Sequence, residues 1–306
     1  MNRTLLLAAT LAALALPATS QAQYSSFAGV NAPTERARVQ LRDEKGRVSF
    51  QEVEREVAKD SYGNADGNRF DLAVDGAFEG QTITVLQFYS FPFEQARDAL
   101  REKGFSVYRF NGEAPSPKAL KEALAKSCQL WLISGDVQLL GKAHLKVIRE
   151  FFEAGHGVYV WGDNDPYYAD ANYVAEALIG ARMLGNLQGD RTVGLQGDPG
   201  KRGLRRGHLL TTGLEHLYEG ITIATIQPND TLTPLVYGSA GNLVAAVYER
   251  DGKRVILDGG FTRLYNKWDT AGTGRYVKNA AAWLAHAERF GDEVLAQRGD
   301  GGAKSR

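Results

Sequence analysis

The sequence predicts an α/β protein with a doubly wound parallel sheet, helices on both faces and antiparallel strands added late in the chain. Between residues 81 and 180, short apolar runs alternate with segments of helical periodicity, as in parallel sheets built from strand–helix units. The run Gly157–Trp161 carries no charge and stops abruptly at Gly162, which is typical of a strand buried on both faces. Between 221 and 257 the apolar runs are instead separated by glycine-containing turns, which indicates hairpins.

The first four units follow from local periodicity and from their start and stop residues. Ser116 and Pro117 suit the N-cap and first position of a helix, while Gly104 and Gly155 end the helices before them. The expected strands are 82–89, 105–110, 130–133 and 157–161, and the expected helices are 92–103, one from 116, 141–154 and 169–179.

The last third of the chain has a different pattern. Turns are expected at 238–241 and 251–252, so the strands there form a meander or hairpins that extend the sheet. A final amphipathic helix follows. The expected strands are 221–226, 232–237, 243–248 and 255–257, and the expected helix is 274–290.

Residues 1–22 have the pattern of a secretory signal peptide. Arg3 supplies one positive charge, 4–16 are uncharged, and small residues lead to an expected cleavage after Ala22. The residue directly after the cleavage point is not a cysteine, so a lipoprotein is excluded, and a periplasmic or secreted location is expected. The apolar run is too short to span a bilayer easily, because a transmembrane helix needs about 20 apolar residues. No later run approaches that length, so no transmembrane segment is expected after cleavage.

The remaining organisation is an N-terminal appendage at 23–80, the α/β domain at 81–290 and a disordered tail at 291–306. In the appendage, 38–43 alternates like a strand, and 48–57 has helical spacing. The chain has 36 Lys and Arg residues and 36 Asp and Glu residues, so its formal net charge is zero. The overall charge therefore does not favour the binding of nucleic acid. The sole cysteine, Cys128, is expected as a buried thiol at the start of a strand.

Candidate site residues lie where the strands of the sheet end. The carboxyl ends of parallel strands meet at one edge, and α/β folds bind their ligands there. Polar residues follow the third and fourth strands, and an aromatic, charged loop follows the last strand. The candidate ligand-binding residues are Asp136, Asp163, Asn164, Asp165, Tyr168, Arg263, Tyr265 and Trp268.

Three interpretations of the Asp163–Asp165 turn stay open. The side-chain oxygens can form the turn and cap the next helix. They can bind a ligand, or a Ca²⁺ or Mg²⁺ ion through Asp163 and Asp165, although the spacing matches no EF-hand. They can also act as a nucleophile or general base, if burial shifts their pKa values. No other cofactor is expected.

The late loop has two interpretations. Four aromatic side chains, those of Tyr167, Tyr168, Tyr265 and Trp268, can line a shallow pocket in which Arg263 binds an anion. Alternatively, these aromatic side chains shield the edge of the sheet and pack against the final helix.

The order of elements resembles the class I glutamine amidotransferase-like fold, a flavodoxin-like superfamily, over about residues 81–289. The resemblance rests on 130–155, on 157–165, and on His208–Leu214 together with Asp258–Thr262. Within that superfamily, the chain resembles secreted branches that lack the catalytic Cys, His and Glu. The catalytic family places a Cys at the sharp turn after the fourth strand, whereas this chain has Gly162-Asp163-Asn164-Asp165 there. Glutamine hydrolysis through a thioester is therefore excluded.

Three functional hypotheses follow. The first is an exported binding or scaffold protein without catalysis, which holds an unknown small ligand. The second is a hydrolase that uses the carboxylates after the fourth strand, with or without a divalent ion. The third is an interaction module that binds an envelope protein through the late aromatic loop and the appendage. Fold alone cannot choose among them.

Overall fold

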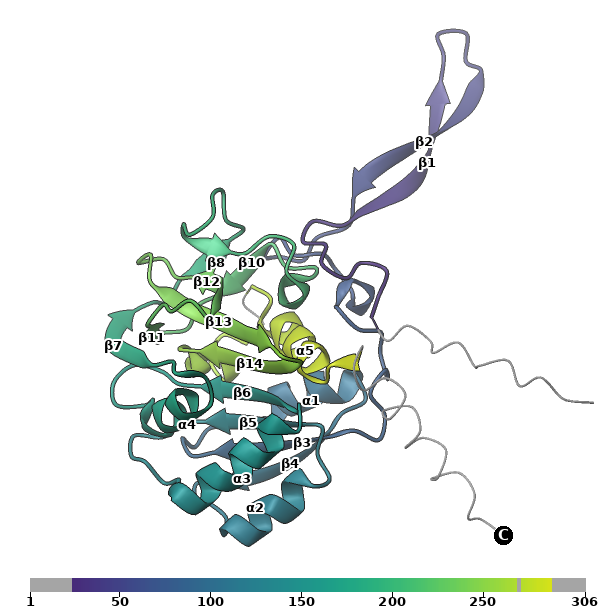
Figure 1. The fold of residues 1–306 in the computed structure, drawn as a ribbon. Coiled ribbons are helices and arrows are strands. Elements are labelled where there is room, and N and C mark those ends of the chain that lie inside the picture. Colours follow the sequence, from purple (N-terminus) through teal and green to yellow (C-terminus); the bar gives the residue numbers. More distant parts are fainter. Residues whose placement is uncertain (1–23, 269–270, 288–306) are drawn as a thin grey trace, which may run out of the picture.

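The core of the protein is one eight-stranded sheet (Figure 1). The computed structural model describes residues 24–268 and 271–287. The strand order is β4-β3-β5-β6-β14-β13-β12-β9, and the first five strands run parallel, whereas β13, β12 and β9 are antiparallel additions. The strands are β3 (Thr82–Gln87), β4 (Ser106–Asn111), β5 (Gln129–Ile133), β6 (Gly157–Trp161), β9 (Gly203–Leu204), β12 (Thr233–Tyr237), β13 (Leu243–Arg250) and β14 (Lys253–Asp258).

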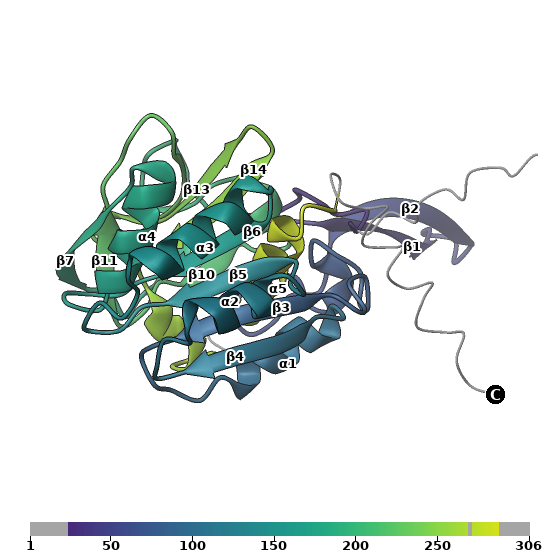
Figure 2. The same cartoon turned by 60° about the horizontal axis from the view of Figure 1, so that its bottom comes forward.

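Helices cover both faces of this sheet (Figure 2). Helices α1 and α5 contact each other on one face, and α2, α3 and α4 lie together on the other. Because both faces of the sheet are covered, its central strands need apolar residues at every position, as strand β6 shows. Its Tyr159 and Trp161 pack into the core on the α1–α5 side, whereas Val158 and Val160 pack under α2–α4. The helices are α1 (Glu94–Glu102), α2 (Pro117–Leu124), α3 (Lys142–Glu153), α4 (Ala169–Ile179) and α5 (Thr273–Leu284).

The predicted α/β class is confirmed, and the first four units lie within a few residues of their expected bounds. Ser116 is the N-cap of α2, where its hydroxyl accepts a hydrogen bond from the Ala119 amide at 3.2 Å. Cys128 precedes β5 as expected, and burial raises the pKa of its thiol to about 12. The last helix ends at Leu284; residues 288–290 and the tail 291–306 lie outside the described residues, as does the signal segment 1–22.

The late strands divide between two sheets, which the sequence pattern did not indicate. Strands β12, β13 and β14 form the expected meander, and β14 attaches it to the parallel sheet by pairing with β6. The expected strand at 221–226 instead becomes β11 (Thr222–Ile226), which pairs with β7 (Met183–Gln188) outside the main sheet. Another small sheet joins β8 (Thr192–Gly194) to β10 (His216–Tyr218). Within the described residues, none of the helices is long and apolar enough to cross a membrane.

The appendage contains a hairpin that projects from the body (Figure 1). Strand β1 (Thr34–Arg42) pairs in antiparallel register with β2 (Val48–Glu56). The helix expected over 48–57 is therefore wrong. The spacing of Phe50, Val53 and Val57 fits a helix, but pairing with β1 supplies each β2 residue with a cross-strand neighbour, and this contact decided the structure.

The rest of the appendage packs on the body through several contacts, among them hydrogen bonds of Asn31 and Asn64 and the ion pairs of one buried carboxylate, Asp71. Its two oxygens form ion pairs with Lys103 at 2.8 Å, Lys278 at 2.8 Å and Arg275 at 2.7 Å. Burial alone would raise the pKa of Asp71, but the three cations outweigh burial and lower the pKa below its ordinary value. Because the cations belong to α5 and to the residue after α1, this contact fastens the chain before β3 to the domain.

Candidate functional site

The carboxyl ends of β3, β6 and β14 meet at one edge of the sheet, and Asp163 lies at its centre. Asp163 directly follows Gly162 at the end of β6 and is fully buried. One carboxylate oxygen accepts hydrogen bonds from the Thr222 hydroxyl and the Asn164 amide, both at 2.9 Å. The other accepts from the Thr262 amide at 3.1 Å. The side chain thus connects β6 with β11 and with the loop after β14.

Among the described residues no cation is a partner of Asp163, and its pKa reflects this. Burial raises the pKa to about 6, although the hydrogen bonds from Asn164, Thr262 and Thr222 oppose the rise. The carboxyl group therefore changes its protonation near neutral pH, in a position that solvent does not reach.

A second buried carboxylate, Asp258 at the end of β14, pairs with Arg263. The guanidinium approaches Asp258 at 2.9 Å and also donates to the Glu219 carbonyl at 2.9 Å. The hydroxyls of Tyr276 and Tyr159 lie 3.2 and 3.4 Å from the same carboxylate oxygen. Burial raises the pKa of Asp258 to about 6, with the Arg263 charge acting against it.

This pair corrects the anion-binding role expected for Arg263. Both Arg263 and Asp258 have no solvent-exposed side-chain surface. The guanidinium faces the interior, where it lies 5.8 Å from the centre of the Trp161 ring, so an anion in solvent does not reach it. The mixture of aromatic and charged residues in the loop could not reveal this. The short 3₁₀ helix Phe261–Leu264 directs the Arg263 side chain into the interior of the protein.

Aromatic side chains cover the edge around Asp163. Tyr89 follows β3 and lies 5.0 Å from Tyr167 and 5.2 Å from Phe261, between ring centres. Tyr265 stacks on Phe91 at 4.5 Å. The three tyrosines are half-buried, so each ring packs on one side and is partly open on the other. Tyr265 thus shields the edge of the sheet, as the second interpretation of the late loop expects, and a ligand pocket lined by it stays a prediction.

The other predicted residues of the Asp163 turn are spread over the surface. Asn164 is half-buried, and its side-chain amide donates to the Asp165 carbonyl at 3.0 Å. The Asp165 side chain is exposed. Burial and, to a smaller extent, the neighbouring Asp165 carboxylate raise the pKa of the Tyr168 hydroxyl. The turn closes through the Tyr167 amide and the Asn164 carbonyl at 2.7 Å. Turn formation is therefore confirmed.

Capping of the next helix by these side chains is wrong. The N-cap of α4 is Tyr168, and its side chain makes no capping bond. Asp170 in the first turn instead accepts from the amides of Leu139 and Leu140, at 2.8 to 3.1 Å, and its own amide donates to the Ser134 hydroxyl. Residues from the loop after β5 therefore replace the local cap.

Two further candidates lie apart from the Asp163 contacts. Asp136 is exposed in the loop after β5. Trp268 is half-buried and packs against the core, with Gly274 at the start of α5 as a close neighbour. The structure therefore brings together Asp163 and the tyrosine rings, and leaves Asp136 outside that group.

Asp163 does not belong to a group of metal-binding side chains within the described residues. In the stretches 24–268 and 271–287, no three His, Cys, Asp or Glu side chains are grouped so that they could hold a metal ion. Amide and hydroxyl hydrogens already point at the Asp163 oxygens, whereas Asp165 is exposed. A Ca²⁺ or Mg²⁺ ion there stays a prediction.

Sequence reasoning missed the partners that fix this edge. Thr222 comes from a strand of another sheet, and Asp258 was noted only as part of a glycine-rich turn. A signal was present for Asp258, because a carboxylate that follows the apolar run 255–257 and precedes Gly259-Gly260 requires a partner if it is buried. For Thr222 no local signal existed.

Comparisons with known proteins give fold similarity at low sequence identity. No family model matches the chain, and no curated protein matches it in sequence. A putative GMP synthase protein from Thermoplasma acidophilum aligns with a TM-score of 0.48 and 11% identity, over 70% of this chain and 98% of that one. A putative ThuA-like protein from Parabacteroides merdae aligns with a TM-score of 0.43 and 12% identity, over 68% and 90%. The carbohydrate deacetylase Agd3 aligns at 0.40 and 14%, over 68% of this chain and 32% of its own.

Proposed function

We propose that this chain is an exported binding protein of the glutamine amidotransferase-like superfamily that has no catalytic activity and holds a small neutral ligand at the tyrosine-rich edge of its sheet. The observation that carries the proposal is the state of Asp163. It occupies the position at which the resembled catalytic family has its nucleophile. Both of its oxygens accept hydrogen bonds from the protein, and solvent does not reach it. A nucleophile must reach its substrate, and the Asp163 carboxylate is enclosed by protein on every side, so we assign this position a role in structure and not in reaction.

The half-buried tyrosines support the choice of ligand. Tyr89, Tyr167 and Tyr265 come from three different loops, and their rings contact one another or share Phe261 and Phe91. Aromatic rings with hydroxyl groups bind ligands that combine an apolar face with hydrogen-bonding groups. The ion pair with Asp258 neutralises the nearby guanidinium of Arg263, so the positive charge that an anionic ligand would need is not available.

Titration calorimetry with a panel of neutral saccharides tests this proposal. Saccharides combine an apolar ring face with hydroxyls. We expect one class to bind, Tyr265→Ala to weaken it at least about tenfold, and Tyr265→Phe to weaken it less. Tyr108→Ala is the matched control, because Tyr108 is exposed on β4, away from this edge. Equal binding by wild type and Tyr265→Ala would remove the tyrosine edge as the site.

One observation favours the alternative, a hydrolase. The pKa of Asp163 is about 6, which suits a general acid or base. The test is turnover of ester, amide and glycoside substrates by wild type and Asp163→Asn, with Ca²⁺, Mg²⁺ or EDTA. Activity that Asp163→Asn abolishes would replace the binding proposal with the hydrolase. A melting temperature unchanged by Ca²⁺, Mg²⁺ and EDTA would remove the divalent ion from both.

A further inference from the structure

Strand β4 forms an open edge of the main sheet. Among the strands that the structure describes, it pairs only with β3, on one side. Its other side presents the main-chain groups of alternate residues for pairing with another strand. Tyr108, in the middle of β4, has 53% of its surface exposed.

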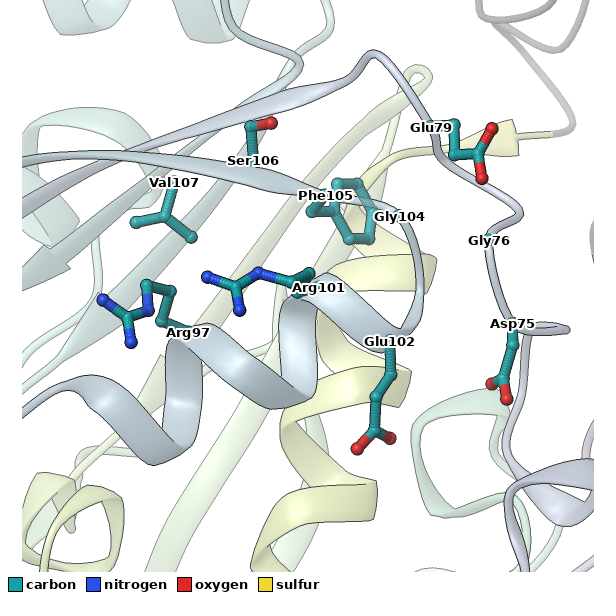
Figure 3. Close-up of a pocket in the computed structure, with 10 residues that line it drawn as sticks. All are labelled: Asp75, Gly76, Glu79, Arg97, Arg101, Glu102, Gly104, Phe105, Ser106 and Val107. Atoms are coloured by element: carbon teal, nitrogen blue, oxygen red, sulfur yellow. The ribbon is translucent and has the colours of Figure 1, made fainter.

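Two hollows flank this edge, one on each face of the sheet. The first, of about 730 Å³, lies between β4 and α1 and is shown in Figure 3. The second, of about 400 Å³, lies between β4 and α2, where Tyr108, Ala119 and Ala123 line it beside Glu122 and Lys126. A strand that pairs with an open edge sends alternate side chains to opposite faces, so both hollows would receive side chains from one added strand.

The first hollow has an excess of positive charge beside β4. Arg97 and Arg101 extend from successive turns of α1 toward this strand, and the only carboxylate that either approaches among the described residues is Asp98, at 3.3 and 3.4 Å (Figure 3). Three acidic residues lie at the far end of the hollow, where Asp75 pairs with Lys103 and Glu102 with Lys278, while Glu79 lies away from the two arginines (Figure 3). At the end beside β4, the two arginines and Asp98 thus leave one positive charge next to the open edge.

The projecting hairpin carries the complementary charges. Glu52 and Glu54 of β2 are exposed on one face of the hairpin, where Arg38 and Arg36 of β1 lie opposite them and the Thr34 hydroxyl donates to Glu54. Neither carboxylate forms an ion pair within the part of the chain that the structure describes, so the β2 edge itself is acidic. They are two residues apart on a strand, which separates them by about 7 Å. Arg97 and Arg101 are four apart on a helix, about 6 Å along its axis. The outer edge of β2 is also unpaired within the described residues.

The hairpin itself needs a covering partner. A two-stranded ribbon alone is marginally stable in water. Apolar residues are exposed on both of its faces, with Leu41 at 45% and Phe50 at 55%. Figure 1 shows the hairpin directed away from the body and from β4 of the same chain, so a strand from another copy is the occupant that fits.

We propose that the hairpin of one copy adds the β2 edge to the β4 edge of a second copy, with Glu52 and Glu54 against Arg97 and Arg101. Val53, on the opposite face of β2, then lies toward the hollow beside Tyr108. Reciprocal exchange of hairpins closes a dimer, and one-way addition builds a chain of copies. This assembly is independent of the ligand-binding proposal, because it uses the edge at β4 and not the end of β6.

Sedimentation velocity over a wide concentration range tests the assembly by a charge exchange. We expect the wild type to associate. Glu52→Arg with Glu54→Arg, or Arg97→Glu with Arg101→Glu, places like charges together and weakens the association at least about a hundredfold. The protein with all four substitutions regains it. Lys142→Glu with Lys146→Glu, on α3, is the matched control and leaves association unchanged, since both lysines are exposed away from β4.

Thermal melting of each variant confirms that the fold is retained. A wild type that stays monomeric at every concentration overturns the proposal. Association that persists in both charge variants also overturns it and assigns the contact to the apolar residues of the hairpin. Failure of the fourfold variant to recover association, when both double variants have lost it, overturns the pairing of these four side chains.

Discussion

Asp71 and Asp163 are both fully buried carboxylates, but their surroundings are opposite. Asp71 has three cationic partners, which lower its pKa against the effect of burial. Asp163 has only hydrogen-bond donors among the described residues, and burial raises its pKa to about 6. Burial alone does not define the role of a carboxylate, because neighbouring charge decides whether the ionised form is stabilised. Asp71 holds the N-terminal segment to the domain through ion pairs. Asp163 links β6 to β11 and to the loop after β14 through hydrogen bonds, and its raised pKa makes its charge easy to neutralise.

The largest expected effect is that of Asp71→Asn. The substitution leaves Lys103 and Lys278 buried without their shared counter-charge, which costs about 3–5 kcal/mol of unfolding free energy. Urea denaturation at neutral pH measures it. Asp75→Asn is the control, since the Asp75 side chain is more than half exposed and its ion pair with Lys103 is worth at most about 1 kcal/mol. Similar losses in the two variants would refute the anchor.

The second prediction compares the pH dependence of stability in wild type and Asp163→Asn. The folded pKa of Asp163 is above the ordinary value of 3.8, so its favourable contribution is complete below that value and is lost as pH rises toward about 6. At about 1.4 kcal/mol per pKa unit, the loss approaches about 3 kcal/mol. Asp163→Asn removes this part of the decline, so the unfolding free energies from denaturation curves at pH 4 and pH 7 should differ less in the variant.

Asp71 gives the opposite sign in the same experiment. Its folded pKa is lowered, so its contribution is present above the unfolded pKa and is lost as pH falls through the folded value. Asp71→Asn should therefore flatten the acid limb below pH 4 and leave the interval from 4 to 6 unchanged. If Asp71→Asn changed the unfolding free energy only between pH 4 and 6, Asp71 would have the raised pKa assigned to Asp163, which would contradict this assignment.

The smallest expected effect is that of Thr222→Val. The substitution removes one hydrogen bond to Asp163, at a cost of about 1 kcal/mol. Because that bond favours the ionised form, its loss also raises the pKa of Asp163 further, and the decline in stability extends to higher pH. Thr225→Val in the same strand is the control, since no hydrogen bond of its hydroxyl occurs within the described residues. An unchanged pH profile in Thr222→Val would contradict the contact.

The elements that the sequence predicted well are those whose evidence is local. The expected strand 157–161 and helix 141–154 match β6 and α3, because an uncharged run and an amphipathic period record burial residue by residue. The failed helix at 48–57 is the opposite case. Its periodicity was ambiguous, and pairing with β1 settled it.

The site was predicted in position but not in contacts. The sequence placed Asp163 at the carboxyl edge because it directly follows a buried strand. It could not show that Thr222, from another sheet, and the Thr262 amide, from the loop after β14, would use both carboxylate oxygens. It also assigned Arg263 a role at the surface, since nothing nearby in the sequence reveals that Asp258 and the Glu219 carbonyl draw it inside.

The sequence by itself determined the α/β class, the order of its units and the absence of a Cys or Ser after β6. These depend on residue type and short-range period. Only the tertiary structure decided which charges are paired. Nothing near Asp71 in the sequence reveals its partners, because Arg275 and Lys278 belong to the last helix, about 200 residues away along the chain. Charge state depends on partners brought together by folding, and for that reason a buried carboxylate cannot be assigned a role until its neighbours in space are known.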